Sequence, residues 1–171
     1  MIISLEEAKI FNPKVTQEWL DGIESTIREV TNNNFQRRAV RLKDVTLKND
    51  TVTSQSRFIG FKQGQTIQVS DSIYNDGLYV VKDVSKNSLT VAGHIFTNAD
   101  ILGAFVTLVI YPPDIVSGVI EMLRYDDKMV DKVGVKSEKI SRYSVTYAEL
   151  QGRYPDSLLS FLDTHMRLRW S

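Results

Sequence analysis

The chain of 171 residues contains no cysteine and only two histidines, and its formal net charge at pH 7 is zero. Without cysteine, neither a disulfide framework nor a thiolate metal site is possible, and a reducing compartment is the expected location. The 21 Lys and Arg residues balance 21 Asp and Glu residues, which argues against a dedicated nucleic-acid binder with its usual basic excess. A protein that surrounds DNA without gripping it remains compatible with this balance.

Long apolar runs are also missing. The longest candidate, at 101–111, is interrupted by Gly103 and Thr107 and predicts a buried strand, whereas a membrane-spanning helix needs about 20 apolar residues. The N-terminal sequence MIISLEEAKIF lacks the basic start and long apolar run of a signal peptide. Apolar residues make up 42% and charged residues 25%, so we expect a folded globular protein without membrane association.

Residues that catalyse reactions or bind metals are scarce. His94 and His165 have no His, Cys or acidic partner at ligand spacing, and the adjacent Asp126 and Asp127 diverge by about 100° on a helix. The segment 71–77 superficially resembles a calcium loop but lacks the alternating oxygen ligands and the closing glutamate. No GxSxG, phosphate-binding glycine loop or nucleophile beside a base is present. We predict no catalytic residue, cofactor or metal, and therefore a protein that is not an enzyme.

Two helices are predicted near the N-terminus. Ser4 and Glu7 have the spacing of a capping box, so a short helix should run to about Phe11 and end before the first proline. Thr16 should cap a longer helix, which the asparagines at 32–34 end. The apolar stripe of that helix consists of Trp19, Leu20, Ile23, Ile27 and Val30.

From about residue 38 the pattern changes to short apolar stretches separated by turn residues, which indicates a small all-β barrel or sandwich. Strands are predicted around 40–47 and at 58–61, 66–69, 78–81, 89–91 and 104–111, with turns at 75–77 and 86–88. The aromatic residues are expected to pack in a core rather than to form a platform for single-stranded nucleic acid. They are Phe58, Phe61, Tyr74, Tyr79, Phe96 and Phe105.

Helical patterns return after the β region. The sequence Pro-Pro-Asp at 112–114 begins a helix, with proline in the first turn, and Gly134 ends it. Its apolar stripe is Ile115, Val119, Met122, Leu123 and Met129 or Val130. A β-hairpin with strands at 135–139 and 142–147 follows, and a last helix begins at 154–157 with Leu158, Leu159, Phe161, Leu162 and Met166 as its apolar residues.

The predicted fold class is α+β, a small helical bundle with a C-terminal β-hairpin, interrupted by an inserted all-β barrel or sandwich. Residues 1–37 and 112–171 would form the discontinuous helical part, and residues 38–111 the inserted module. Insertion is tolerated where the host chain ends lie close together. A lone two-stranded hairpin is marginal in water, so two arrangements stay open. Tyr143, Val145 and Tyr147 pack on the protein's own helices, or the hairpin edge joins a neighbouring subunit.

Four segments carry a resemblance to a known family: ISLEEAK at 3–9, GVKSEKI at 134–140, YSVTY at 143–147, and YP at 154–155 before the helix SLLSFL. Together they resemble the head–tail connector proteins of tailed phages, also called adaptor or head-completion proteins. The resemblance covers about 1–36 and 112–171. The hairpin turn departs from the Gly-Asp common in such proteins, since Ser141 and Arg142 stand there. The inserted module resembles a small β-barrel of phage structural proteins, but simple connectors lack it.

The resemblance implies a homo-oligomeric ring, commonly a dodecamer, below the portal protein at the head–tail interface of the virion, with assembly in the host cytoplasm. Such a ring extends the channel through which double-stranded DNA passes without sequence-specific binding. It also provides a platform for a neck, stopper or tail-completion protein. A ring requires two different contact surfaces on each copy, and the helix at 16–34 and the hairpin are the candidates. The candidate ring or portal residues are Lys136, Glu138, Ser141, Arg142, Tyr143, Val145, Tyr147, Arg167, Arg169 and Trp170.

Two alternatives stay open at this point. The basic segment HMRLRWS at 165–171 either suits the dipole at a helix C-terminus and covers the core with Trp170, or it docks into the portal, because Trp and Arg are enriched at binding hot spots. The second alternative concerns the function of the whole chain. In it, the chain is a binding module whose β-barrel recognises a polymer such as glycan or single-stranded DNA, and the helices serve only as scaffold.

Overall fold

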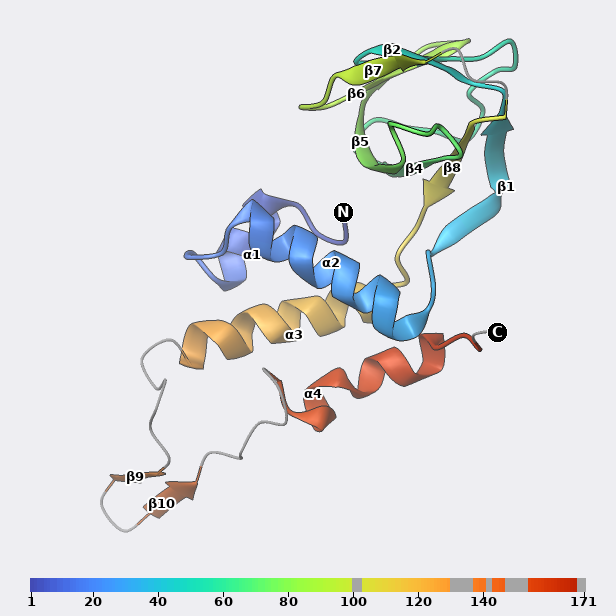
Figure 1. The fold of residues 1–171 in the computed structure, drawn as a ribbon. Helices are drawn as coiled ribbons and strands as arrows, with labels where there is room; N and C mark the ends of the chain where they lie inside the picture. The colour runs from blue at the N-terminus through green and yellow to red at the C-terminus, as the bar shows by residue number, and fades with distance from the viewer. Residues whose placement is uncertain (100–102, 130–136, 141–142, 147–153, 169–171) are drawn as a thin grey trace. The chain divides into compact units, whose positions relative to one another are not determined.

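The computed structural model describes residues 1–99, 103–129, 137–140, 143–146 and 154–168, and its mixture of helices and antiparallel strands confirms the α+β class (Figure 1). The chain divides into two compact units. The β unit comprises Met1 and Asn34–Tyr111, and the helical unit comprises Ile2–Asn33 and Pro112–Ser171. The β module was predicted to begin at residue 38, whereas the β unit begins at Asn34, just ahead of the first strand.

Side-chain caps fix the starts of the first two helices, as the sequence predicts. In α1 (Leu5–Phe11), the Ser4 hydroxyl accepts a hydrogen bond from the Glu7 N–H, and the Glu7 carboxylate accepts one from the Ser4 N–H, each at 3.2 Å. The Thr16 hydroxyl caps α2 (Gln17–Thr31) by accepting a hydrogen bond from the Trp19 N–H, and Asn32 ends α2 with a left-handed φ of 48°. These local signals are therefore confirmed.

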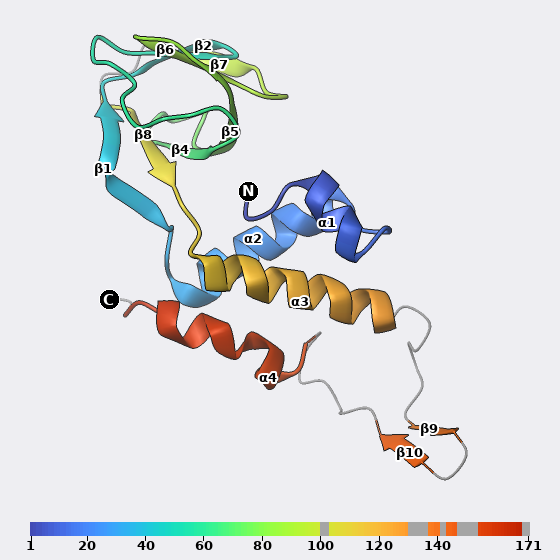
Figure 2. The same cartoon turned by 180° about the vertical axis from the view of Figure 1, so that it is seen from behind.

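The rest of the helical unit is built around α3 (Pro113–Met129), which contacts α1, α4 (Asp156–Leu159) and the 3₁₀ helix η2 (Ser160–His165). Figure 2 shows α2, α3 and the α4–η2 segment from behind. Four members of the predicted α3 stripe are confirmed, since Ile115, Val119, Met122 and Leu123 are buried. Met129 is only half-buried, and Val130 and the predicted helix end at Gly134 lie outside the described residues. α3 and η2 approach closely at Gly118, where a Cβ would lie 2.4 Å from the Phe161 ring.

The hairpin segment contains β9 (Ser137–Ile140) and β10 (Tyr143–Thr146), which form a separate antiparallel sheet of two strands. Glu138 lies opposite Val145, and Ile140 lies opposite Tyr143. The predicted strands at 135–139 and 142–147 begin or end outside the described residues.

The β unit is an eight-stranded antiparallel sheet with the order β1-β8-β4-β5-β6-β3-β2-β7. β1 and β7 are its two edges, so the sheet is open, whereas the predicted barrel would pair them; no ladder joins these strands within the described residues. Its strands are β1 (Gln36–Lys43), β2 (Thr46–Asn49), β3 (Thr51–Thr53), β4 (Thr66–Ser70), β5 (Gly77–Val84), β6 (Ser88–Val91), β7 (Phe96–Ala99) and β8 (Phe105–Val109).

The chain enters and leaves the β unit through neighbouring strands. Gln36 at the start of β1 lies opposite Val109 at the end of β8. Just beyond this pair, the Ile110 N–H donates a 3.0 Å hydrogen bond to the Phe35 carbonyl, and the rings of Phe35 and Tyr111 lie 4.9 Å apart. Backbone and side-chain contacts thus hold the two ends of the β unit together.

The structure corrects one aromatic residue of the predicted core and one predicted strand. Phe58, Phe61 and Phe96 are buried, but Tyr74 is 73% exposed. The predicted strand at 58–61 is wrong, because this segment is a turn in which Gly60 has a φ of +89°. Its apolar residues are buried nonetheless, since the rings of Phe58 and Phe61 meet edge to face in the core with centroids 5.7 Å apart.

The loop between β4 and β5 is organised by its own side chains. The Asp76 carboxylate accepts hydrogen bonds from the Ser72 N–H at 2.7 Å and the Asp71 N–H at 3.2 Å. The Ser72 hydroxyl donates a further bond and is the main cause of the lowered pKa of Asp76. Buried Asn75 connects this loop to β7, donating to the Thr97 carbonyl at 2.8 Å and accepting from the Thr97 N–H at 2.9 Å.

Candidate functional site

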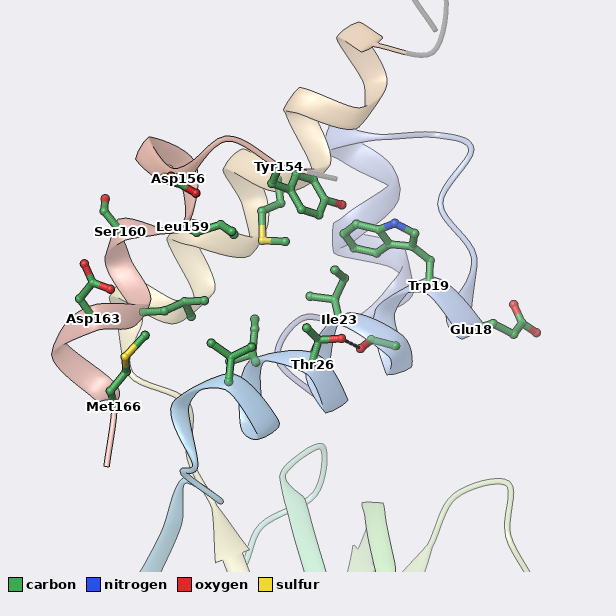
Figure 3. A pocket seen from close by; sticks show the side chains of 15 residues that line it. Glu18, Trp19, Ile23, Thr26, Tyr154, Asp156, Leu159, Ser160, Asp163 and Met166 are labelled. Carbon is green, nitrogen blue, oxygen red and sulfur yellow. Dashed lines mark hydrogen bonds between the residues drawn. The ribbon is translucent and has the colours of Figure 1, made fainter. Parts of the chain in front are cut away.

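An apolar groove of about 780 Å³ lies in the helical unit between α2, α3 and the α4–η2 segment. Trp19 and Tyr154 lie toward one end of the groove and Met166 toward the other (Figure 3). The groove is lined by Glu18, Trp19, Gly22, Ile23, Thr26, Ile27, Val30, Met122, Tyr154, Asp156, Leu159, Ser160, Leu162, Asp163 and Met166.

The groove exists because the apolar stripe of α2 is wider than the surface that packs against it. Leu20 and Ile27 are buried, but Val30 is 50% exposed. On the opposite wall Leu162 is buried, whereas Met166 follows η2 and is 53% exposed. An amphipathic helix normally buries its whole apolar stripe, so this face of α2 remains partly uncovered by the described part of the chain.

A buried tyrosine fixes one end of the groove. The Tyr154 hydroxyl donates a 2.8 Å hydrogen bond to the Asp126 carboxylate, and the rings of Tyr154 and Tyr125 lie 6.0 Å apart. Asp126 is thus a half-buried hydrogen-bond acceptor rather than part of a fully solvated helix face. Because Tyr154 and Met122 are both buried, this end of the groove has a preformed wall.

Gly22 is the most unusual residue in the groove. It lies within α2, where glycine costs the helix about 1 kcal/mol relative to alanine. A Cβ added at Gly22 would have no heavy atom within 4 Å, apart from its own neighbours and the helix backbone. The packing of this chain therefore does not require a glycine here.

The charges at the groove are all acidic. Glu18, Asp156 and Asp163 are among the 15 lining residues, and none of the 15 is Lys or Arg. The pKa of Glu18 is lowered by hydrogen bonds from its own backbone N–H and from the Thr16 hydroxyl, so Glu18 stays ionised at neutral pH. The groove thus combines an apolar lining with negative charge.

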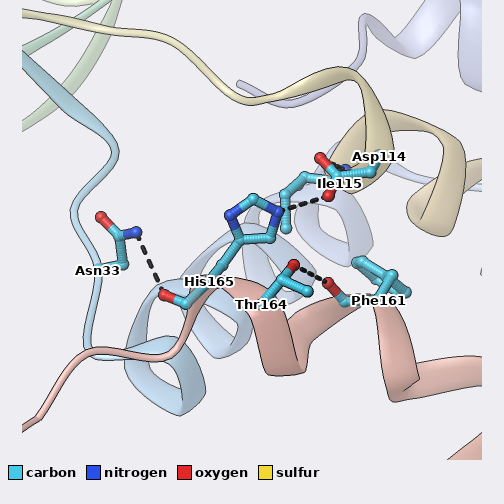
Figure 4. Close-up of polar contacts among 6 residues, drawn as sticks. All are labelled: Asn33, Asp114, Ile115, Phe161, Thr164 and His165. Atoms are coloured by element: carbon cyan, nitrogen blue, oxygen red, sulfur yellow. Dashed lines mark hydrogen bonds and ion pairs between the residues drawn. The ribbon is translucent and has the colours of Figure 1, made fainter.

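A second polar feature of the helical unit is a contact between His165 and Asp114 (Figure 4). The His165 Nε2 lies 2.6 Å from Asp114 Oδ2, and Asn33 donates a 3.3 Å hydrogen bond to the His165 carbonyl. The hydrogen bond with His165 is the main cause of the lowered pKa of Asp114. Spacing arguments missed this partner because 51 residues separate the two side chains. Within the described residues, no group of three or more His, Cys, Asp or Glu is placed to hold a metal ion.

Only part of the predicted ring or portal surface can be placed. Glu138 lies on β9, and Tyr143 and Val145 lie on β10. Arg167 is exposed and follows η2 instead of ending it, because the backbone is already extended at Met166. The other predicted residues lie outside the described part of the chain: Lys136, Ser141, Arg142, Tyr147, Arg169 and Trp170.

A basic strand is a further surface feature that was not predicted from the sequence. β1 carries Arg37, Arg38, Arg41 and Lys43, and no acidic residue lies between Asn34 and Lys43. Arg41 donates a 2.8 Å hydrogen bond to the Thr107 hydroxyl and lies 5.0 Å from the centre of the Phe105 ring. The β unit contains nine Lys and Arg against six Asp and Glu, so the zero net charge of the chain conceals a basic part.

Comparisons with known proteins assign no family, because no protein-family model and no curated protein matches the chain. Among the helices in the described ranges, none has the length and apolar character required to cross a bilayer.

Proposed function

We propose that this protein is a structural subunit of a phage head–tail connector. Copies of the chain would form a ring, commonly a dodecamer in such connectors, below the portal protein. The ring would extend the DNA channel and provide a platform for a neck, stopper or tail-completion protein. The sequence segments at 1–36 and 112–171 that resemble connectors suggest the class, and the open apolar groove is the structural observation that carries the proposal.

In this proposal the helical unit is a small bundle with a C-terminal β-hairpin, and both parts make contacts between copies. A ring of identical copies needs two different, complementary surfaces on each copy. The groove supplies one such surface. β9 and β10 pair only with each other within the described residues, so each strand has an outer edge on which a strand of a neighbour could pair.

Mass photometry of the purified chain, alone and with the portal ring of the same phage, tests this function. We expect complexes that contain several copies of the chain for each portal ring, together with a ring of copies below the portal in electron micrographs. A chain that stays monomeric and fails to bind the portal at every salt concentration would overturn the proposal.

The basic strand β1 favours a second candidate function, in which the β unit binds a polyanionic polymer. Arg37, Arg38 and Lys43 are exposed on an edge strand, where each can approach a phosphate group. Contacts between such cations and phosphates release condensed counterions and supply sequence-independent affinity for nucleic acid. Single-stranded DNA therefore fits this basic surface better than a neutral glycan does.

A further inference from the structure

We infer that the groove of the helical unit receives the segment around Leu168 from a second copy of the chain. This inference rests on the proposed function, since it identifies a contact between neighbouring copies in the ring. It concerns the groove alone and requires nothing of the hairpin or the β unit.

Gly22 indicates that the groove is shaped for an occupant. Alanine at this position would favour the helix, and outside its own helix its Cβ would have no heavy atom of the described residues within 4 Å. A glycine in such a place allows another group to approach the helix backbone closely. Val30 and Met166 also line the groove and are exposed, so they provide further apolar surface that an occupant would bury.

The segment at 167–170 has the chemistry that the groove lacks. Its sequence, Arg-Leu-Arg-Trp, alternates basic with large apolar residues, and Leu168 is 79% exposed. The groove offers apolar walls and carboxylates at Glu18, Asp156 and Asp163, and none of its described lining residues is a Lys or Arg. Apolar anchors flanked by arginine are typical of the residues that dominate the energy of protein interfaces. The two surfaces are therefore complementary in both apolar character and charge.

The structure also holds the backbone of Arg167 and Leu168 in place. The Arg167 N–H donates a 2.8 Å hydrogen bond to the Thr31 carbonyl at the end of α2. The side-chain amide of Asn32 donates to the carbonyls of Arg167 and Leu168 at 3.4 Å and 3.2 Å. Holding the backbone beforehand lowers the entropic cost of binding.

The same contacts argue for a second copy rather than for the chain's own segment. Leu168 is fixed beside Asn32, beyond the C-terminal end of α2, and its high exposure means that it does not fill the groove of its own copy. Gly22 lies nine residues before Thr31, about 14 Å along the helix axis. A Leu168 from a neighbour can instead reach Gly22 directly, and such a contact is heterologous, as a ring requires.

The absence of cysteine makes disulfide trapping a clean test. Full-length Gly22→Cys and Leu168→Cys variants carrying different tags are mixed, oxidised mildly and separated by mass. We expect a mixed disulfide dimer, with a yield at least about tenfold above that of Ser25→Cys mixed with Leu168→Cys. Ser25 is the matched control, because it is exposed on α2 and does not line the groove. Equal yields, or no mixed dimer in either pair, would overturn the inference.

The double variant Gly22→Cys/Leu168→Cys separates the two possible sources of the segment. A disulfide that forms within one chain at high dilution would place the chain's own segment in the groove and would overturn contact between copies. A disulfide that forms only between chains, at a yield that rises with protein concentration, supports the inference.

A blocking variant separates this inference from the proposed function. In Gly22→Leu the Cβ meets no neighbouring side chain, and the rest of the leucine extends into the groove that Gly22 lines. This variant should therefore fold and yet lose ring formation on the portal, whereas Ser25→Leu, outside the groove, should assemble normally. If Gly22→Leu forms rings like the unmodified chain, the groove contact is wrong and the connector function stands. If the Gly22→Cys and Leu168→Cys variants form the trapped dimer but the unmodified chain never forms a ring on the portal, the groove contact stands and the connector function is wrong.

Discussion

His165 and Asp114 join the end of η2 to the first turn of α3 through a contact of 2.6 Å between Nε2 and Oδ2. The Asp114 carboxylate also accepts a 3.0 Å hydrogen bond from the Ile115 N–H. Asp114 thus makes a hydrogen bond at the start of α3 and also contacts the last side chain of η2. Because the contact joins two elements of the helical unit, its loss should lower the stability of that unit.

This contact predicts an acid-dependent part of the stability. The pKa of Asp114 is lower in the folded chain than the value of about 3.9 expected when unfolded. The stabilisation is therefore present above pH 4 and is lost as the pH falls through the folded pKa. Asp114→Asn and His165→Ala should both remove it, at a cost of about 1 kcal/mol or less because Asp114 is half-exposed and water screens the contact.

Urea unfolding between pH 2.5 and 7 measures this effect, and Asp127→Asn on the exposed side of α3 is the matched control. If Asp114→Asn and Asp127→Asn have the same pH profile as the unmodified chain, the carboxylate of Asp114 does not contribute in this way.

Two glycines of the helical unit should respond to alanine in opposite directions. Gly118→Ala places a Cβ 2.4 Å from the Phe161 ring and should destabilise the fold by about 1–3 kcal/mol, because η2 must move away from α3. Gly22→Ala meets no neighbour and should stabilise it by about 0.5–1 kcal/mol. Thermal and urea unfolding of both variants measure the difference. Destabilisation by Gly22→Ala would mean that the helix needs glycine at this position for its own packing.

Asn75 should determine the stability of edge strand β7. Asn75→Asp keeps the size of the side chain but replaces the amide donor with a carboxylate oxygen that faces the Thr97 carbonyl, at an expected cost of about 1–3 kcal/mol. The loss of stability should be largest above the pKa of the new carboxyl group. It should be smaller in acid, where the protonated carboxyl can again donate a hydrogen bond to the Thr97 carbonyl. Hydrogen exchange at the β7 amides, with exposed Gln63→Glu as the charge control, measures it. Unchanged protection of β7 in Asn75→Asp would show that the bridge contributes little.

The cations of β1 should determine any binding of single-stranded DNA by the β unit. Replacing Arg37 and Arg38 with alanine should weaken binding to an oligo(dT) probe and reduce the slope of log K against log salt by about 1.4, since each phosphate contact contributes about 0.7. Fluorescence anisotropy measures both quantities. Lys82→Ala with Lys86→Ala removes the same charge elsewhere on the unit. No binding at low salt, or equal losses in both pairs, would exclude β1 as the binding surface.

Features encoded by neighbouring residues could be predicted from the sequence. Ser4 and Thr16 cap their helices and Asn32 ends α2, because each of these contacts spans at most four residues. The buried stripe of α3 was also predictable, since its period follows from helix geometry alone. The groove could not be predicted from the sequence. The apolar stripe of α2 has the same period whether its residues are buried, as Ile27 is, or exposed, as Val30 is.

Features that depend on distant partners were missed or misjudged. β3 and β7 are short and rich in Thr or Asn, and they are strands because they pair with β6 and β2. The apolar run at 58–61 has the composition of a strand, but Gly60 allows it to turn while both phenylalanines reach the core. His165 has no acidic neighbour in sequence, yet Asp114 contacts it from the start of another helix.

The joined ends of the β unit, where Ile110 bonds to Phe35 and Gln36 lies opposite Val109, have an evolutionary consequence. A segment whose first and last residues lie side by side can be acquired or deleted through a single genetic exchange, provided that the reading frame is kept. A lineage could then carry a shorter and a longer version of the protein as interchangeable forms. The longer version could then diversify its β unit while the helical unit stays unchanged.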